Sequence, residues 1–243
     1  MVAAEIREGL PTIHLDRLAE AYIRDNGGTP AFKGYKMDDE GSEFPATLCI
    51  SINEEIVHGI PSDRVIRDGD IVSVDCGVFL DGWVGDHAYT FMVGNVPERT
   101  RKLVDVTRQS LDVGIKQIKA GGAVGDIGFE INKFVRKNAF YVVRELVGHG
   151  VGRNLHEAPQ VPNIDKRYNG AKFKDGLVIA IEPMICQGTE KVMQLNDNWT
   201  IVTADRQPAC HFEHDVAFIN GKADVLSTFA FVDEALKGRN DVR

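Results

Sequence analysis

The chain has 243 residues, 43% of them hydrophobic, which is enough for one large domain or two small ones with a buried core. Its formal net charge of −8 argues against nucleic-acid binding and against an anionic membrane surface, and no apolar run approaches the length of a membrane span. The four cysteines have no CxxC spacing, so we expect reduced thiols in the cytoplasm, and neither a zinc knuckle nor a disulfide framework.

The N-terminal part of the chain is expected to alternate between helices, loops and strands. Apolar spacing and turn residues predict, in order, a helix over 1–8, an amphipathic helix over 14–25, a loop over 26–46, a strand over 47–52 and a polar loop over 53–61 that carries His58.

Residues 70–91 predict a β-hairpin, because two runs rich in β-branched residues are joined by an Asp-Gly turn at 81–82. With this turn, Asp75 lies opposite Ala88. Since side chains alternate between the faces of a strand, Asp75 and Asp86 share one face, with Cβ atoms within roughly 7–8 Å. Two such carboxylates repel each other and are costly to desolvate, so either one keeps a proton or a cation lies between them.

The rest of the chain is expected to contain two more helices and several strands. The pattern predicts a long helix over 97–119, a helix over 126–138, an apolar strand over 139–147, a Gly- and Pro-rich loop over 148–170, a strand over 177–185 and further strands with turns over 191–230.

A weak internal repeat relates the two halves of the chain. Residues 5–24 align with 117–136 at an offset of 112, and residues 68–75 align with 175–182 at an offset of 107. The second alignment places Glu182 at the position of Asp75, so that each half brings a carboxylate on the same strand to a common centre. Chance recurrence of a charged residue, a glycine and an apolar strand is the alternative.

The repeat predicts a single domain over 1–243 with halves at about 1–96 and 97–230. The helix expected at 97–119 is more than twice as long as its counterpart at 1–8. We therefore expect that the chain begins inside a helix whose first half is absent.

Two histidines lie in a segment rich in glycine, Gly148-His-Gly-Val-Gly-Arg-Asn-Leu-His-Glu157. Glycines at alternate positions exclude a stable helix and allow the backbone to approach an ion or a substrate closely. A lone histidine in a loop is most often solvated, but two in such a segment favour a functional role for His149 and His156.

Two glutamates occur where an apolar strand would bury them. Glu182 follows four apolar residues, and Glu213 runs into another apolar stretch, although buried glutamates are rare without a partner. Together with Asp75, Asp86 and His149 they make four carboxylates and one imidazole, which suit two divalent ions. Bridging carboxylates would set such ions about 3.5–4 Å apart, and a water between them would serve as the nucleophile of a hydrolysis.

An ordered set of motifs resembles the methionine aminopeptidases of the short, type I class. These motifs are His58-Gly-Ile-Pro, Asp75 followed by Gly-Asp86, Gly-His149-Gly-Val-Gly with His156-Glu, Ile-Glu182-Pro-Met and Glu213-His. The resemblance covers residues from about 5 to 220, and the type I assignment rests on the short separation between His156 and Glu182. It implies the pita-bread fold, an α+β architecture with two pseudo-twofold-related αβ halves around a central antiparallel sheet.

The resemblance also implies an activity and its metal site. The implied reaction is hydrolysis of the N-terminal methionine from nascent proteins whose second residue is small, by a water or hydroxide held on two divalent ions (Co, Mn, Fe or Zn). The residues that match the metal ligands are Asp75, Asp86, His149, Glu182 and Glu213. Asp86 and Glu213 match the bridging acids, and Glu182 also matches the residue that manages the proton of the bound water.

Further positions match residues that contact the substrate. His58 matches a histidine near the scissile amide or its leaving nitrogen, and His156 one near the substrate carbonyl, where an N–H donor would stabilise the developing oxyanion. Phe44, Cys49 and Trp199 match the lining of the methionine side-chain pocket, with plain core packing as the alternative. The implied partners are the N-termini of nascent polypeptides, at the ribosome, and we expect a monomer.

The chain departs from the family pattern at three places. His87 replaces a Thr or Ser, Asp215 stands where a small hydroxyl residue is common, and the loop 33–46 is more acidic than usual. By strand alternation His87 points away from Asp86, so we do not expect it to bind metal. These departures bear on the specificity pocket and leave the hydrolytic core intact.

Two other functions stay open at this point. One is an X-Pro aminopeptidase or prolidase of the same fold, against which the motif at Glu182 and the presence of Trp199 argue. The other is a non-catalytic pita-bread binding module, against which the retention of all five candidate ligands argues.

Overall fold

The computed structural model describes residues 1–36 and 41–243. The helices in these residues are α1 (Val2–Glu5), α2 (Thr12–Asp25), α3 (Glu98–Ile115), α4 (Val124–Lys137) and α5 (Ala230–Leu236). Over the same ranges, no helix combines the length and the apolar character needed to cross a membrane.

The strands are short and pair with one another in an antiparallel sense. They are β1 (Thr29–Pro30), β2 (Cys49–Ile52), β3 (Glu55–Val57), β4 (Ile71–Asp75), β5 (Val78–Leu80), β6 (Trp83–Gly85), β7 (Ala88–Met92), β8 (Tyr141–Val142), β9 (Val147–Gly150), β10 (Glu157–Pro162), β11 (Val178–Ile181), β12 (Met184–Cys186), β13 (Val192–Gln194), β14 (Ile201–Thr203), β15 (Ala209–His211), β16 (His214–Ile219) and β17 (Lys222–Val225).

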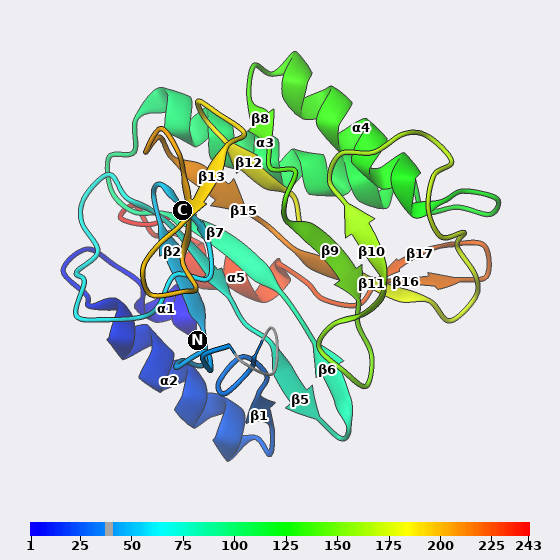
Figure 1. The fold of residues 1–243 in the computed structure, drawn as a ribbon. Helices are drawn as coiled ribbons and strands as arrows, with labels where there is room; N and C mark the ends of the chain where they lie inside the picture. Colours follow the sequence, from blue (N-terminus) through cyan, green and yellow to red (C-terminus); the bar gives the residue numbers. More distant parts are fainter. Residues whose placement is uncertain (37–40) are drawn as a thin grey trace.

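These strands form small sheets at the centre of the molecule, with helices on the outside (Figure 1). The strand orders are β10-β9-β11-β16-β17, β2-β4-β7, β15-β12-β8, β13-β14-β3 and β1-β5-β6. Helices α3 and α4 pack on each other and on strands of the second half, whereas α2 lies beside β1 in the first half. Helices combined with antiparallel sheets confirm the predicted α+β class.

Helices α2, α3 and α4 form where the sequence pattern predicts them, because their apolar residues recur on one face. In α4 the buried side chains are spaced three or four residues apart, as Ile127, Ile131 and Val135 show. Asp126 Oδ2 accepts a hydrogen bond of 2.9 Å from the Ala123 N–H at the start of this helix, which satisfies one of the free donors there. An offset of 112 maps the bounds of α2 onto those of α4. The division into halves at about 1–96 and 97–230 stays a prediction.

The hairpin has the predicted register. Asp81 and Gly82 have φ angles of 51° and 77°, as a two-residue turn of the favoured hairpin type requires. Asp75 pairs with Ala88, and the same register continues in β5 and β6. The ladder is interrupted midway, however, so β4 and β7 belong to one sheet and β5 and β6 to another. Asp86 lies in that interruption.

The prediction for residues 139–170 was partly wrong. The expected single strand over 139–147 is divided into β8 and the start of β9, and the expected loop over 148–170 contains β10 and most of β9. A Cβ atom at Gly148 would collide with the Ala180 carbonyl, and one at Gly150 with the Ala158 carbonyl. The glycines therefore allow close contact between strands, and the prediction that they let the backbone approach an ion or a substrate stays a prediction.

Three smaller boundaries also differ from prediction. The expected polar loop at 53–61 contains β3, and the expected strand at 177–185 is interrupted by Glu182 and Pro183. The helix expected over 1–8 is limited to α1.

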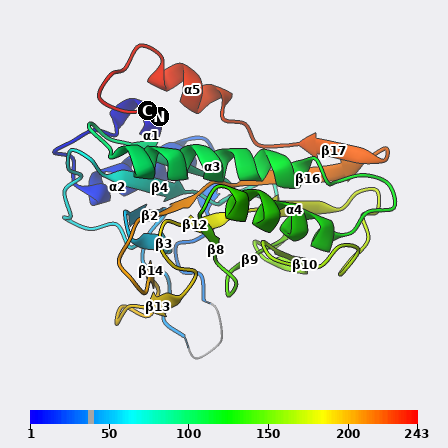
Figure 2. The ribbon, with the colours of Figure 1, turned by 90° about the horizontal axis from the view of Figure 1, so that it is seen from above.

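The C-terminal segment, which the sequence pattern left unassigned, folds back onto the N-terminal half. Helix α5 packs against α1, and Figure 2 shows the two on the same side of the molecule. The Arg239 guanidinium donates to the carbonyls of Ala3 and Ile6 at 2.9 and 2.7 Å. Val242 forms a bridge to Val93 beside β7. The last residues thus tie α1 to the edge of the first half.

Candidate metal and substrate site

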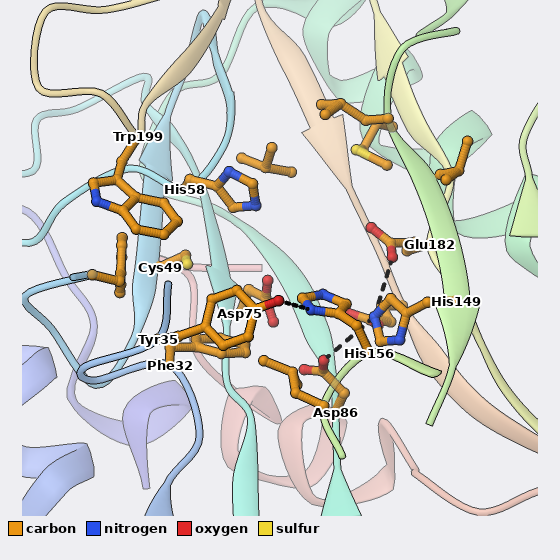
Figure 3. A pocket seen from close by; sticks show the side chains of 17 residues that line it. Phe32, Tyr35, Cys49, His58, Asp75, Asp86, His149, His156, Glu182 and Trp199 are labelled. Atoms are coloured by element: carbon orange, nitrogen blue, oxygen red, sulfur yellow. Dashed lines mark hydrogen bonds and ion pairs between the residues drawn. The ribbon is translucent and has the colours of Figure 1, made fainter. Parts of the chain in front are cut away.

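A cavity of about 310 Å³ opens at the centre of the molecule, where strands from the N-terminal and C-terminal parts of the chain meet (Figure 3). All ten residues predicted for metal binding, catalysis or substrate binding line it: Phe44, Cys49, His58, Asp75, Asp86, His149, His156, Glu182, Trp199 and Glu213. The cavity has a carboxylate-rich end and an apolar end.

The acidic end brings together side chains that are far apart in sequence. Asp86, His149 and Glu213 each offer a ligand atom, and these atoms all lie within 4.8 Å of one another. His149 Nε2 lies 3.6 Å from Glu182 Oε1 and 3.8 Å from Asp86 Oδ2. Asp75 interacts with Asp86 through its side chain, as the shared face in the hairpin predicted.

The four carboxylates occupy equivalent places in the strands that carry them. Asp75 is the last residue of β4, and Asp86 lies between β6 and β7. Glu182 lies between β11 and β12, and Glu213 between β15 and β16. Each acid therefore stands where a strand changes from one sheet to another, and there the backbone can turn a side chain into the cavity. His149 differs, because it lies within β9.

The electrostatics of this end are unfavourable without a cation. Burial raises the pKa values of Asp75, Glu182 and Glu213 well above their usual range, and repulsion from the neighbouring carboxylates raises them further. Burial also raises the pKa of Asp86, with His149 acting in the opposite direction. Four acids in one buried cluster cannot all ionise unless positive charge is placed among them.

The donor set fits divalent metal ions. Asp75 Oδ1 and Glu213 Oε1 are buried and have no hydrogen-bond partner within the part of the chain that the structure describes, although buried polar atoms are normally paired. Carboxylate oxygens with one imidazole suit hard or borderline divalent ions, and an ion would pair these oxygens and offset the mutual repulsion.

Three side chains with polar tips, His58, His156 and Tyr35, also line the cavity. The His156 ring lies 4.3 Å from that of His149 at the acidic end. His58 is half-buried, and burial lowers its pKa to about 4. Desolvation and the neighbouring His149 and His58 lower the pKa of His156 to about 4, so both rings are neutral near pH 7. The Tyr35 hydroxyl lies 2.6 Å from His156 Nδ1, a contact visible in Figure 3. Tyr35 was missed by sequence analysis, because it lies in a loop without a periodic pattern.

The apolar end is lined by a separate cluster of buried side chains. Phe44, Cys49 and Trp199 belong to it together with Phe32 and Leu155, and Figure 3 shows Trp199 and Cys49 across the cavity from Glu182. The Phe44 and Trp199 rings meet edge to face at 5.2 Å. These residues both pack together and line the cavity, so the two interpretations of them are compatible.

His87 and Asp215, which depart from the family pattern beside the candidate ligands, do not line the cavity. The His87 ring stacks on that of His214 at 5.2 Å and faces away from the cavity, as strand alternation predicted. Asp215 Oδ2 accepts a hydrogen bond of 2.7 Å from the Asp86 N–H, and burial raises the pKa of Asp215 to about 7. Asp215 thus holds the backbone of Asp86 at its strand break. The acidic loop 33–46 includes residues 37–40, which lie outside the described residues.

His211 is a second site residue that sequence analysis missed. Its Nε2 lies 3.8 Å from Glu182 Oε2 and 3.9 Å from Glu213 Oε2. A signal was present in the sequence, because residues two apart in a strand share a face, so His211 lies on the same side as Glu213.

A cavity with clustered buried acids, histidines and an apolar wall, on this fold, is typical of a metal-dependent hydrolase. The model of metallopeptidase family M24 matches residues 1–218. The chain therefore belongs to metallopeptidase family M24, which confirms the family resemblance.

Individual relatives are similar over most of their length. Methionine aminopeptidase 1 of Bacillus subtilis is 44% identical over 222 residues, which are 91% of this chain and 87% of the relative. The crystal structure of methionine aminopeptidase from Thermotoga maritima superposes with a TM-score of 0.88 at 40% identity and covers 93% of this chain and 88% of that one. These similarities confirm the predicted pita-bread fold.

A prolidase shares the fold at lower similarity. The prolidase from Pyrococcus furiosus superposes with a TM-score of 0.71 at 21% identity, over 93% of this chain and 58% of that one. At this identity the likeness concerns the fold alone.

Proposed function

We propose that this protein is a methionine aminopeptidase, which hydrolyses the N-terminal methionine from polypeptides whose second residue is small. The observation that carries the proposal is the cavity, in which buried acids at one end face an apolar pocket at the other. Similarity to relatives named methionine aminopeptidase supports it.

We infer that five side chains hold two divalent ions, which are Co, Mn, Fe or Zn. The ligands are Asp75, Asp86, His149, Glu182 and Glu213, with Asp86 and Glu213 as the bridging acids. The ligand atoms within 4.8 Å of one another at Asp86, His149 and Glu213 support this assignment. When bound, the ions would lower the pKa of a water and polarise the scissile carbonyl.

The remaining polar groups would act on the substrate directly. Glu182, as a carboxylate in a desolvated place, would take the proton of the attacking water and pass it to the leaving amine. A neutral His156 with its proton on Nε2 would donate to the substrate carbonyl oxygen as negative charge develops there. His58 would contact the scissile amide or its leaving nitrogen.

Substrate selection would take place at the apolar wall. Phe44, Cys49 and Trp199 would enclose the unbranched methionine side chain, and burial of that side chain would be worth about 1.5–3 kcal/mol. Partners of this site would be the N-termini of nascent polypeptides, including those at the ribosome. We propose that the protein acts in the cytoplasm as a monomer.

A comparison of two peptides tests the proposed substrate. Met-Ala-Ser should be cleaved, whereas an X-Pro dipeptide should not, in the presence of added Mn²⁺ or Co²⁺. Cleavage of the X-Pro dipeptide in preference to Met-Ala-Ser would assign the chain to the prolidase class instead.

A single substitution tests the proposed metal site. Asp86→Asn removes a charge and a bridging oxygen, so we expect loss of hydrolysis together with weaker metal binding in calorimetry. A variant that cleaves at the wild-type rate would contradict the two-metal mechanism and would revive the binding-module alternative.

A further inference from the structure

His211 is a buried imidazole that faces two of the proposed ligands without being one of them. Its side chain is 2% exposed, and its Nε2 lies 3.8 Å from Glu182 Oε2 and 3.9 Å from Glu213 Oε2. Across residues 1–36 and 41–243, Nε2 meets no hydrogen-bond partner. Buried ring nitrogens are normally hydrogen-bonded. We therefore expect a small movement of Glu182 or Glu213 to bring one of their oxygens into hydrogen-bond contact with this nitrogen.

The backbone of His211 is fixed by contacts that do not involve the acids. His211 pairs with Met184 in the ladder between β15 and β12. The Thr90 hydroxyl donates a hydrogen bond of 2.6 Å to the His211 carbonyl, and the Thr90 oxygen also lies 2.8 Å from the Ser73 hydroxyl. The place of the imidazole is therefore set by the sheet.

The direction of the side chain follows from strand register. The pairing of Met184 with His211 and of Ile181 with His214 has the same register on both sides of the strand break. Glu182 and Glu213 lie in that break, and each is two residues from Met184 or His211. Because residues two apart share a face, His211 points toward the same side as both glutamates.

Direct ligation of an ion by His211 fits the distances less well than hydrogen bonding does. In the described chain, the side chains whose ligand atoms approach one another within 4.8 Å are Asp86, His149 and Glu213, and His211 is not in this group. Its Nε2 instead lies at nearly equal distances from two different carboxylates, which is the placement of a donor shared between them.

We propose that His211 is a positioning residue whose Nε2–H is shared between the carboxylates of Glu182 and Glu213 and holds both in the orientation that binds the metal ions. This inference rests on the proposed metal site. A small rotation of either glutamate brings an oxygen within hydrogen-bond distance. Hydrogen bonds to metal ligands fix their orientation, and their loss typically costs about 10–100-fold in metal affinity.

Two substitutions separate the hydrogen bond from the bulk of the ring. His211→Gln keeps an N–H donor at about the distance of Nε2 from the backbone, whereas His211→Leu keeps a buried side chain without a donor. We expect the Leu variant to bind Mn²⁺ about 10–100-fold more weakly in calorimetric titration, and the Gln variant to stay within about threefold of the wild type, since its donor is retained. Cleavage of Met-Ala-Ser should be slower in the Leu variant than in the Gln variant, and the difference should lie in kcat.

The control lies next to His211 on the same strand. Cys210 is fully buried in the main core, so Cys210→Ala disturbs β15 without removing a donor from the site. It should lower the melting temperature and leave the affinity for Mn²⁺ unchanged. If the Leu variant does not fold, His211→Asn replaces it, because the shorter amide cannot reach the two glutamates.

Three results would overturn the proposal. The first is Mn²⁺ affinity of the Leu or Asn variant equal to that of the wild type. The second is equal loss in the Gln and Leu variants, which would show that ring packing matters and the donor does not. The third is a changed visible absorption spectrum of the Co²⁺ form in the Gln variant, which would show that the His211 imidazole binds the ion directly.

The same titrations distinguish this proposal from the proposed function. If the wild type binds no Mn²⁺ or Co²⁺, the metal site itself is wrong, and with it the role of His211. If the wild type binds metal and Asp86→Asn does not, the metal site stands, and the His211 variants then decide the positioning role alone.

Discussion

We expect the Tyr35 hydroxyl to set which nitrogen of His156 carries the proton. Burial raises the pKa of Tyr35, so the phenol keeps its proton, and the low pKa of His156, about 4, keeps that ring neutral. A neutral imidazole that accepts a hydrogen bond at Nδ1 has its proton on Nε2. If the Tyr35 hydroxyl is the donor in its contact of 2.6 Å with Nδ1, Nε2–H is left as a donor toward the cavity.

Tyr35→Phe tests this tautomer. The variant keeps the aromatic ring of the wall and loses one hydrogen bond, worth about 0.5–1.5 kcal/mol. We expect kcat for Met-Ala-Ser to fall about 2–10-fold, with KM nearly unchanged. Steady-state kinetics measures both values.

Tyr22→Phe is the matched control, because Tyr22 is exposed on α2 and its hydroxyl has no place in the site. A rise in KM without a change in kcat for Tyr35→Phe would show that this hydroxyl contributes to substrate binding. It would also show that the hydroxyl does not set the tautomer of His156.

At the scale of elements, the start of α4 depends on one buried carboxylate. Asp126 accepts hydrogen bonds of 2.9 Å from the N–H groups of Ala123 and Tyr168. Burial acts to raise the pKa of Asp126, but these two donors, with Lys172 and Arg167 nearby, outweigh it and lower the pKa below the usual 3.8. The ionised form is therefore the one that stabilises the fold.

Asp126→Ala should lower the free energy of unfolding by about 0.5–2 kcal/mol, the cost of losing a helix cap. The pKa of Asp126 is lower in the folded chain than in the unfolded chain. The stabilisation is therefore fully present above the unfolded pKa of about 3.8, and it is lost as the pH falls from there through the folded pKa. Urea unfolding at neutral pH and at acid pH measures this, and the wild type and the variant should converge in acid. A difference that persists unchanged in acid would contradict a role for the ionised carboxylate.

Local signals explain which elements could be predicted. The hairpin follows from its Asp-Gly turn, and that turn alone places Asp75 and Asp86 on one face. The strand that carries His149 was predicted as a loop, because Gly148 and Gly150 permit several conformations, and only the close neighbours Ala180 and Ala158 select the extended one.

In the candidate site, too, some residues could be predicted from local sequence and others could not. Its acids could be predicted, because Asp75 and Asp86 share a face of the hairpin and Glu182 and Glu213 adjoin apolar runs. Tyr35 and the C-terminal segment could not, since Tyr35 meets His156 across 121 residues, and Arg239 meets Ala3 across 236. Contacts at such separations depend on the assembled fold and leave no pattern in the neighbouring sequence.

At the scale of the molecule, the C-terminal segment lies largely beyond the residues that the family model matches, which end at 218, yet it is tied to the fold. Arg239 donates to carbonyls at the end of α1, and the backbone of Arg243 exchanges hydrogen bonds with that of Met92.

Arg239→Ala should lower the free energy of unfolding by about 1.5–3 kcal/mol, the range for hydrogen bonds that involve a charged group. Denaturant unfolding measures the loss. Lys237→Ala is the control on the same segment, because Lys237 is exposed and its ion pair with Glu234 joins two exposed side chains of little energetic consequence. Equal stability of the two variants would show that the hydrogen bonds from Arg239 to α1 do not stabilise the fold.

Metal binding should stabilise the whole molecule. An ion that binds the folded chain alone adds about 1.4 kcal/mol for each tenfold excess over its dissociation constant. We expect Mn²⁺ to raise the melting temperature of the wild type and a chelator to lower it again, as thermal unfolding followed by circular dichroism measures. Asp86→Asn should show little of this response, and an equal response in that variant would place the stabilising ion elsewhere.

The strand breaks that carry the four acids have a consequence for how the protein matures. Asp75 and Asp86 come from one pair of interrupted strands, and Glu182 and Glu213 from another, with His149 between them in sequence. A chain still emerging during synthesis, with only its N-terminal part folded, possesses two of the four acids that we propose to bind the ions. With these ligands, we expect ion binding to follow folding of the whole chain. Ion uptake would mark the final checkpoint in biogenesis, separating a finished enzyme from a folding intermediate.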